Sequence, residues 1–302
     1  MGNASLKKIA VLTSGGDAPG MNAAIRAVVR TANYHKIECV GVRGGYTGLI
    51  EGNFTKMGPR SVSNIINLGG TILRSARSKE FRTEEGRQKA FEQCQKNGID
   101  ALVCIGGDGT FTGAKIFAEE FGVKVIGVPG TIDNDIYGTD FTIGYDTALN
   151  TAMEAIDKIR DTATSHNRVF FIEVMGRDAG FIALNSGIAS GALDILIPEK
   201  KDRLEDLFET FEKAQKRGKT SSIVIVAEGE RLASTYELAE QTKQRFPDYD
   251  IRVSILGHIQ RGGAPSCADR VLASRMGYGA VVGLLKGLTN VMAGIRSNDL
   301  VF

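Results

Sequence analysis

Two stretches of the sequence share one plan, a short apolar run followed by Gly-Gly-Asp and then small residues. Residues 9–24 are "IAVLTSGGDAPGMNAA", and residues 101–115 are "ALVCIGGDGTFTGAK". Glycine lets a backbone turn sharply and approach a ligand closely, while a helix N-terminus offers free N–H groups and the positive end of its dipole. Two such loops at the carboxyl ends of parallel strands suit a polyphosphate. The alternative interpretation is a pair of tight βα turns. Neither loop carries the P-loop or the G-x-G-x-x-G motif.

The chain as a whole alternates apolar runs with segments of helical spacing. The runs are "IAVL", "ECVGV", "ALVCIGG", "VKVIGV", "RVFFIEV", "DILI", "SSIVIVAEG" and "RVSILG". Between them, side chains such as Leu149, Met153, Ile156 and Ile159 recur at helical intervals. This order predicts an α/β protein with two Rossmann-like lobes, mostly parallel sheets covered by helices, and an active site in the cleft between the lobes. We predict that residues 1–143 and about 263–302 form one lobe and residues 144–262 the other.

Composition excludes several classes of partner. The 302 residues carry 37 basic and 35 acidic side chains, a net charge of +2, which indicates no strong preference for nucleic acid or for a membrane surface. No apolar run approaches the ~18 residues that a membrane span needs. The four cysteines form no C-x-x-C pair, which is typical of reduced structural thiols in a cytoplasmic protein.

The stretch "VPGTIDNDIYGTD", residues 128–140, places Asp133, Asp135 and Asp140 close together. A metal ion, a hydroxyl awaiting deprotonation, or solvent at a turn would each explain this charge. Asp108, in the preceding βα loop, should emerge at the same sheet edge, where one carboxylate could approach Mg²⁺ and another accept a proton. Phosphoryl transfer needs this division of labour, and Thr131 could support the transferring group.

Several cations stand beside predicted strand ends. A planar guanidinium suits a sugar phosphate, although surface salt bridging is the commoner role of arginine. His258 could bind a phosphate or be a packed side chain, and Glu228 could bind sugar hydroxyls or cap a turn. The arginines in question are Arg168, Arg177, Arg252 and Arg261.

The motifs "TSGGDAPGMNAAIR", "IGGDGT", "PGTIDND", "EVMGR" and "LGHIQRGG" together resemble the phosphofructokinase family, in its bacterial, ATP-dependent form. "GGDGT" alone also resembles NAD kinases and lipid kinases, whereas "PGTIDND" with "GHIQRGG" is specific to phosphofructokinases. The resemblance implies phosphoryl transfer from MgATP to the 1-hydroxyl of fructose 6-phosphate, a glycolytic step. It also implies an ATP/Mg-binding first lobe, a sugar-phosphate-binding second lobe and an allosteric homotetramer.

The same resemblance implies roles for individual residues. Asp133 would be the general base, supported by Asp135, while Thr131 and Arg177 would stabilise the phosphoryl group and Asp108 would hold Mg²⁺. The nucleotide would be surrounded by Gly16, Tyr46, Arg77, Arg82, Gly109, Thr110 and Gly113. The sugar phosphate would be held by Met175, Glu228, His258 and Arg261, with Arg168 and Arg252 reaching its 6-phosphate from a neighbouring subunit.

Two groups of residues bear on the donor and on regulation. Pyrophosphate-using relatives typically carry Asp and Lys where this chain has Gly109 and Gly130, so the glycines favour ATP over pyrophosphate. The family's effector cluster is represented by Arg26, Arg30, Arg160, Arg217 and Lys219. Pro59 replaces a further arginine and Leu193 replaces an acid, although Arg60 and Asp194 are adjacent. The alternative from another functional class is a subunit that senses nucleotides and has no catalytic activity. Such a subunit would be expected to lack Asp133, Asp108 or Arg177, and this chain has all three.

Overall fold

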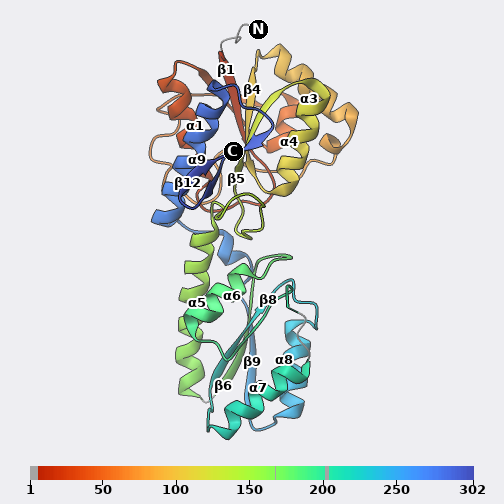
Figure 1. The fold of residues 1–302 in the computed structure, drawn as a ribbon, viewed down its shortest axis with the longest axis vertical. Helices are drawn as coiled ribbons and strands as arrows, with labels where there is room; N and C mark the ends of the chain where they lie inside the picture. Colours follow the sequence, from red (N-terminus) through yellow and green to blue (C-terminus); the bar gives the residue numbers. More distant parts are fainter. Residues whose placement is uncertain (1–5, 167, 201–203) are drawn as a thin grey trace. The chain divides into compact units, whose positions relative to one another are not determined.

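The computed structural model describes residues 6–166, 168–200 and 204–302. The chain forms two compact units (Figure 1). The first comprises Met1–Ile132, Ile136–Asp146 and Arg261–Phe302, and the second comprises Asp133–Asp135 and Thr147–Gln260. The sequence prediction set the second lobe at residues 144–262. Which substrate each unit binds stays a prediction.

The first unit is built on a six-stranded sheet in the order β10-β5-β4-β1-β2-β3. All neighbouring strands are parallel except β2 and β3. The strands are β1 (Lys8–Thr13), β2 (Glu38–Val42), β3 (Phe54–Met57), β4 (Ala101–Gly106), β5 (Lys124–Pro129) and β10 (Val291–Met292). A hairpin of β11 (Gly294–Arg296) and β12 (Asp299–Val301) follows. β1 and β4 are buried almost throughout, as a parallel strand covered on both faces should be.

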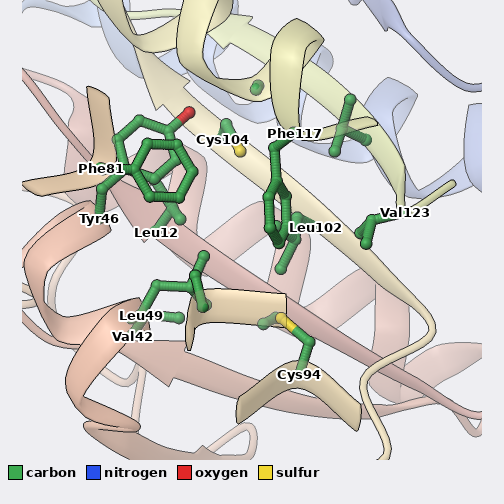
Figure 2. Packing of buried hydrophobic residues seen from close by; sticks show 14 of the residues in the cluster. Leu12, Val42, Tyr46, Leu49, Phe81, Cys94, Leu102, Cys104, Phe117 and Val123 are labelled. Atoms are coloured by element: carbon green, nitrogen blue, oxygen red, sulfur yellow. The ribbon is translucent and has the colours of Figure 1, made fainter. Parts of the chain in front are cut away.

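Helices cover both faces of this sheet. α1 (Met21–Tyr34) packs along α9 (Cys267–Leu285) beside the sheet, and α3 (Glu84–Lys96) and α4 (Asp108–Phe121) lie on the other side (Figure 1). Two short helices, α2 (Gly45–Glu51) and η1 (Glu80–Arg82), complete the second face. Figure 2 shows its core, in which Phe117 of α4 and Tyr46 of α2 pack with Leu102 and Cys104 of β4.

The second unit contains a four-stranded parallel sheet in the order β7-β8-β6-β9. Its strands are β6 (Arg168–Val174), β7 (Asp194–Leu196), β8 (Ser222–Ala227) and β9 (Asp250–Ile255). The helices of this part of the chain are α5 (Tyr145–Ser165), α6 (Phe181–Ser190), α7 (Leu204–Lys216), α8 (Thr235–Arg245) and η2 (Gly257–Arg261). Phe171, Phe211 and Phe246 form its aromatic core, which joins β6 to α7 and the end of α8.

All eight predicted apolar runs form strands, and the α/β class with mainly parallel sheets is confirmed. The helix predicted from Leu149, Met153, Ile156 and Ile159 is α5. Among the described residues, no helix has the length and apolar character needed to cross a bilayer.

Candidate active site

Three neighbouring strands of the first sheet end at one edge, and each continues into a predicted site loop. The parallel register pairs Thr13 of β1 with Ile105 of β4, and Gly106 of β4 with Pro129 of β5. The backbone continues this pairing beyond the strands, because Ser14 N donates to Ile105 O at 3.0 Å and Gly130 N donates to Gly106 O at 3.0 Å. The loops that begin at Ser14, Gly107 and Gly130 therefore lie side by side.

The two glycine-rich loops are tied together by the hydroxyl of Thr110. This side chain is 3% exposed, and its Oγ1 donates to Ser14 O at 3.1 Å. A Cβ on Gly106 would lie 2.4 Å from both Ser14 O and Thr110 Oγ1, which is far inside van der Waals contact. Glycine at 106 is thus required for the close approach of the loops. Thr110, predicted to contact the nucleotide, also holds the shape of the loop edge.

The space available for a side chain differs between Gly109 and Gly130, the two glycines predicted to favour ATP as the donor. A Cβ on Gly109 would meet nothing within 4 Å, whereas a Cβ on Gly130 would lie 3.2 Å from both Ile105 Cγ2 and Met21 Cε. Position 109 therefore opens onto free space next to the exposed carboxylate of Asp108, the first residue of α4. Position 130 is thus tightly packed, and a side chain there would require Ile105 or Met21 to shift, which the sequence did not reveal.

Arg261 lies against the first glycine-rich loop. A Cβ on Gly16 would be 2.5 Å from Arg261 Nη1, and the same nitrogen donates to Asp17 O at 3.2 Å. Arg261 belongs to the first unit, although the sequence prediction placed it in the second lobe. The structure thus joins a residue predicted to hold the sugar phosphate to a loop predicted to hold the nucleotide.

Tyr46 and Gly113 are neighbours in the core. The Tyr46 ring is 5% exposed, stacks on Phe81 with 4.0 Å between ring centroids, and donates its hydroxyl to Thr110 O. A Cβ on Gly113 would lie 3.2 Å from Tyr46 Cε2, so glycine leaves room for this ring. Burial raises the pKa of the Tyr46 hydroxyl well above its ordinary value. Direct contact of Tyr46 with a nucleotide stays a prediction.

Arg77 and Arg82 are exposed, as an anion-binding pair should be. Arg82 closes η1, and Arg77 lies in the segment 58–79, which contains no helix or strand. The structure places both in the first unit, with the glycine-rich loops.

The acidic stretch, residues 128–140, is divided between the two units. Asp133–Asp135 group with the second unit, although Ile132 and Ile136 on either side group with the first. Asp133 is 6% exposed, Asp135 is exposed, and Asn134 between them has a φ of 54°. Thr131 lies beside the second glycine-rich loop, since a Cβ on Gly107 would be 3.9 Å from Thr131 Cβ.

Another set of predicted residues gathers where the strands of the second sheet end. β6 leads into Met175 and Arg177, β8 leads into Glu228, and β9 leads into His258. Because β6 is parallel to both β8 and β9, these residues emerge at one edge. Glu228 N donates to Val174 O at 2.9 Å, which confirms the proximity of the first two loops.

The loop after β6 is held in an uncommon backbone conformation. Arg177 has a φ of 57° and Gly176 a φ of 147°, and left-handed backbone at a non-glycine residue is typical of functional loops. The Arg177 side chain is 72% exposed.

Two residues that the sequence analysis missed shape this edge. Gly229 passes the Arg177 carbonyl so closely that a Cβ would lie 1.9 Å from its oxygen, and buried Gln260 accepts from Met175 N at 3.3 Å.

Arg168 and Arg252 lie elsewhere in this sheet. Arg168 is the first residue of β6, and its Nε donates to Asp250 Oδ2 at 2.7 Å. Arg252 Nη2 lies 3.0 Å from Asp250 Oδ1. The hydrogen bond from Arg168, with the charge of both guanidiniums, lowers the pKa of the Asp250 carboxyl. The sequence analysis missed Asp250, although it lies two residues before Arg252, a spacing that places side chains on one face of a strand.

The predicted effector residues are divided between the units. Arg26 and Arg30 lie on α1 of the first unit. Arg160 of α5, Arg217 and Lys219 lie in the second, where Arg160 donates to Ser190 O. Leu193 packs against the hydrophobic core of the second unit, and Pro59 and Arg60 are exposed. Neither unit therefore holds the whole cluster.

Comparison with known proteins identifies the family. The phosphofructokinase family profile matches residues 8–284. The chain belongs to the phosphofructokinase family. It is 57% identical over 298 residues to ATP-dependent 6-phosphofructokinase 2 of Bacteroides thetaiotaomicron, covering 99% of this chain and 91% of that protein. It is 58% identical to ATP-dependent 6-phosphofructokinase 1 of Thermus thermophilus, covering 96% and 89%.

Solved phosphofructokinases share the fold. The Pichia pastoris phosphofructokinase in the T-state superposes with a TM-score of 0.94 at 39% identity, covering 98% of this chain and 34% of that longer one. A pyrophosphate-dependent phosphofructokinase from Marinobacter aquaeolei gives a TM-score of 0.84 at 24% identity, covering 97% and 79%. The second likeness concerns the fold alone.

Proposed function

We propose that this chain is an ATP-dependent 6-phosphofructokinase that transfers the γ-phosphoryl group of MgATP to the 1-hydroxyl of D-fructose 6-phosphate, giving fructose 1,6-bisphosphate and ADP. The observation that carries the proposal is the pair of glycine-rich loops joined by a hydrogen bond of 3.1 Å from Thr110 Oγ1 to Ser14 O, with Thr131 at the same sheet edge beside the second loop. The names of its relatives, at 57% and 58% identity over nearly the whole chain, support ATP as the donor.

Asp133 acts as the general base. Its carboxylate accepts the proton of the 1-hydroxyl as the oxygen attacks the γ-phosphorus, and the P–O bond to ADP breaks. Burial, at 6% exposure, keeps bulk water away from this carboxylate. Thr131 and the exposed guanidinium of Arg177 stabilise the charge on the transferring phosphoryl group, and Asp135 supports the site.

The residues present fit a magnesium ion carried by the nucleotide. The described residues contain no group of three or more His, Cys, Asp or Glu that could hold a metal by themselves. Mg²⁺ usually binds through one or two carboxylates together with substrate phosphates, and the exposed carboxylate of Asp108 opens beside Gly109. Asp108 would hold the ion, which supplies neutralisation of phosphate charge.

The sugar phosphate binds to Met175, Glu228, His258 and Arg261. Arg168 and Arg252 contact its 6-phosphate from a neighbouring subunit of a homotetramer. The support for this sharing is the position of Arg168, which begins β6, whereas Met175 follows the end of the same strand. The extended backbone holds the two residues about 23 Å apart, at ~3.3 Å per residue of strand.

A coupled assay with fructose 6-phosphate tests the proposal by comparing ATP with pyrophosphate at equal concentrations. We expect turnover with ATP and little with pyrophosphate. Preference for pyrophosphate would identify the alternative donor class, and activity with neither would disprove the kinase assignment.

A further inference from the structure

Asn22 is a buried amide in the first turn of α1, immediately after the first glycine-rich loop. It is 1% exposed, and both ends of its side chain are used. Nδ2 donates to Leu68 O and to Gly69 O, each at 3.1 Å, and Oδ1 accepts from Ile72 N at 2.8 Å. All of its partners are backbone groups of one segment, residues 68–72.

This segment satisfies its own backbone only in part, through short turns in which, for example, Ser61 N donates to Gly58 O and Leu68 N donates to Ile65 O. Residues 58–79 contain no helix or strand, so the N–H and C=O groups that these turns leave unpaired need partners from elsewhere in the chain or from solvent. Asn22 supplies three such partners, at Leu68, Gly69 and Ile72. Beyond these residues, Gly44 N donates to Leu73 O at 2.9 Å, and Thr13 Oγ1 donates to Arg74 O at 3.0 Å.

The segment anchored by Asn22 also contacts the motif "GHIQRGG". A Cβ on Gly69 would lie 2.3 Å from Gly263 O, so the backbone at 69 passes directly over the end of "GHIQRGG". Arg261 of that motif lies against Gly16. The amide of Asn22 therefore holds together the β1–α1 loop, the segment that leads to Arg77, and the backbone beside Arg261, all within the first unit.

We propose that Asn22 is a positioning residue for nucleotide binding, which acts through Arg77. The inference rests on the proposed function. Arg77 is exposed on a segment with no internal regular structure, so its guanidinium can be placed against a phosphate only if the preceding backbone is anchored. Asn22 provides the first part of that anchor, ahead of the bonds from Gly44 N and Thr13 Oγ1. It does so from the helical turn that follows the glycine-rich loop, which fixes the segment leading to Arg77 relative to that loop.

The Asn22→Asp variant keeps the shape of the side chain but replaces the amide donor with an oxygen. That oxygen would face two carbonyl groups at 3.1 Å, so both of these hydrogen bonds are lost and the backbone at residues 68 and 69 is no longer held, whereas the carboxylate can still accept from Ile72 N. We expect the Kd for MgATP, measured by calorimetry, to rise about tenfold, in keeping with the loss of such bonds. The KM for ATP should rise similarly, whereas kcat at saturating ATP and the KM for fructose 6-phosphate should change less.

The matched control is Asn33→Asp, the same substitution on an exposed residue of the same helix. It should leave MgATP binding unchanged. Asn22→Ala, which introduces no charge, serves if the Asp variant does not fold. A thermal melt separates a positioning role from a purely structural one. A purely structural residue would, when replaced, lower Tm and the active fraction without raising the Kd of the folded protein for MgATP.

A double-mutant cycle with Arg77→Ala tests whether Asn22 affects MgATP binding through Arg77. If Asn22 acts through Arg77, adding Asn22→Asp to the Arg77→Ala protein should change the Kd for MgATP by less than about twofold. An equal effect in both backgrounds, or an unchanged Kd in both folded Asn22 variants, would overturn the inference. Failure of the unmodified protein to bind MgATP would overturn the proposed function itself, a result distinct from either of these.

Discussion

Arg168 and Arg252 bind the same carboxylate, that of Asp250. Arg168 Nε donates to Asp250 Oδ2 at 2.7 Å, and Arg252 Nη2 lies 3.0 Å from Asp250 Oδ1. The two cations are therefore held as a pair, with the Arg168 side chain 28% exposed. A shared acid between them reduces their repulsion and orients both guanidiniums, which suits recognition of one phosphate by two arginines.

Replacing either arginine should weaken sugar-phosphate binding selectively. We expect Arg168→Ala and Arg252→Ala to raise the KM for fructose 6-phosphate about tenfold or more, since a charge-assisted contact is lost, and to leave the KM for ATP nearly unchanged. Steady-state kinetics with each substrate varied in turn measures the effect. Arg245→Ala is the control, because Arg245 also pairs with an acid, Glu212 at 3.0 Å, elsewhere in the second unit.

Mixing experiments test whether the arginines act across an interface. Arg168→Ala subunits mixed with Asp133→Asn subunits should regain activity, because some shared sites would combine an intact base with an intact arginine. Subunit exchange is verified by native mass spectrometry of tagged chains. Exchanged oligomers that remain inactive would argue for sites contained within one chain.

Removing the base should abolish most turnover without unfolding the protein. We expect Asp133→Asn to lower kcat by at least ~10²-fold, because an amide cannot accept the hydroxyl proton, while MgATP binding persists. The control is Asp157→Asn, on an exposed position of α5. Near-native turnover of the Asp133 variant would make this carboxylate a turn residue.

The space at Gly109 predicts a change in donor use. A side chain there meets nothing within 4 Å, so Gly109→Asp should fold normally and add a negative charge beside Asp108. The KM for ATP should rise through repulsion of the nucleotide phosphates, with less harm to pyrophosphate use, since pyrophosphate has no α-phosphate. Equal losses with both donors would remove position 109 from donor selection.

Activation by MgADP should be weak, because Leu193 stands where the family has an acid. This side chain packs against the core of the second unit and cannot ligate Mg²⁺, so we expect weak activation by MgADP and a smaller loss of inhibition by phosphoenolpyruvate. Titration of each effector at subsaturating fructose 6-phosphate measures this. Leu193→Glu should strengthen MgADP activation, and its Tm is followed because a carboxylate beside the core destabilises the unit. Strong activation of the unmodified protein would mean that Asp194 compensates.

Thiol labelling should distinguish one cysteine from three. Burial raises the pKa of Cys39, Cys94 and Cys104 to about 12, so these thiols stay protonated and unreactive at pH 8. Cys267 is exposed and should react alone in the native protein, whereas all four should react in denaturant. Fast labelling of more than one thiol at pH 8 would show that the core of the first unit opens.

The sequence by itself determined the elements and much of the chemistry. The runs around Val11, Val103 and Phe171 are locally apolar and β-branched or aromatic, and each forms a strand. The edge at which Asp108 and Thr131 emerge also follows from sequence, because consecutive parallel strands end on the same side. These features depend on neighbours in the chain, whose spacing is visible in the sequence.

Only the tertiary structure decided which distant segments touch. Asn22 binds residues 68–72, Arg261 covers Gly16, and Arg168 is placed at the opposite end of β6 from Met175. No local pattern marks these relationships, because they arise from strand order and from the need of buried polar groups to find partners wherever the chain folds back. The same residue types at the same spacing would carry no such contacts in a sheet with another strand order.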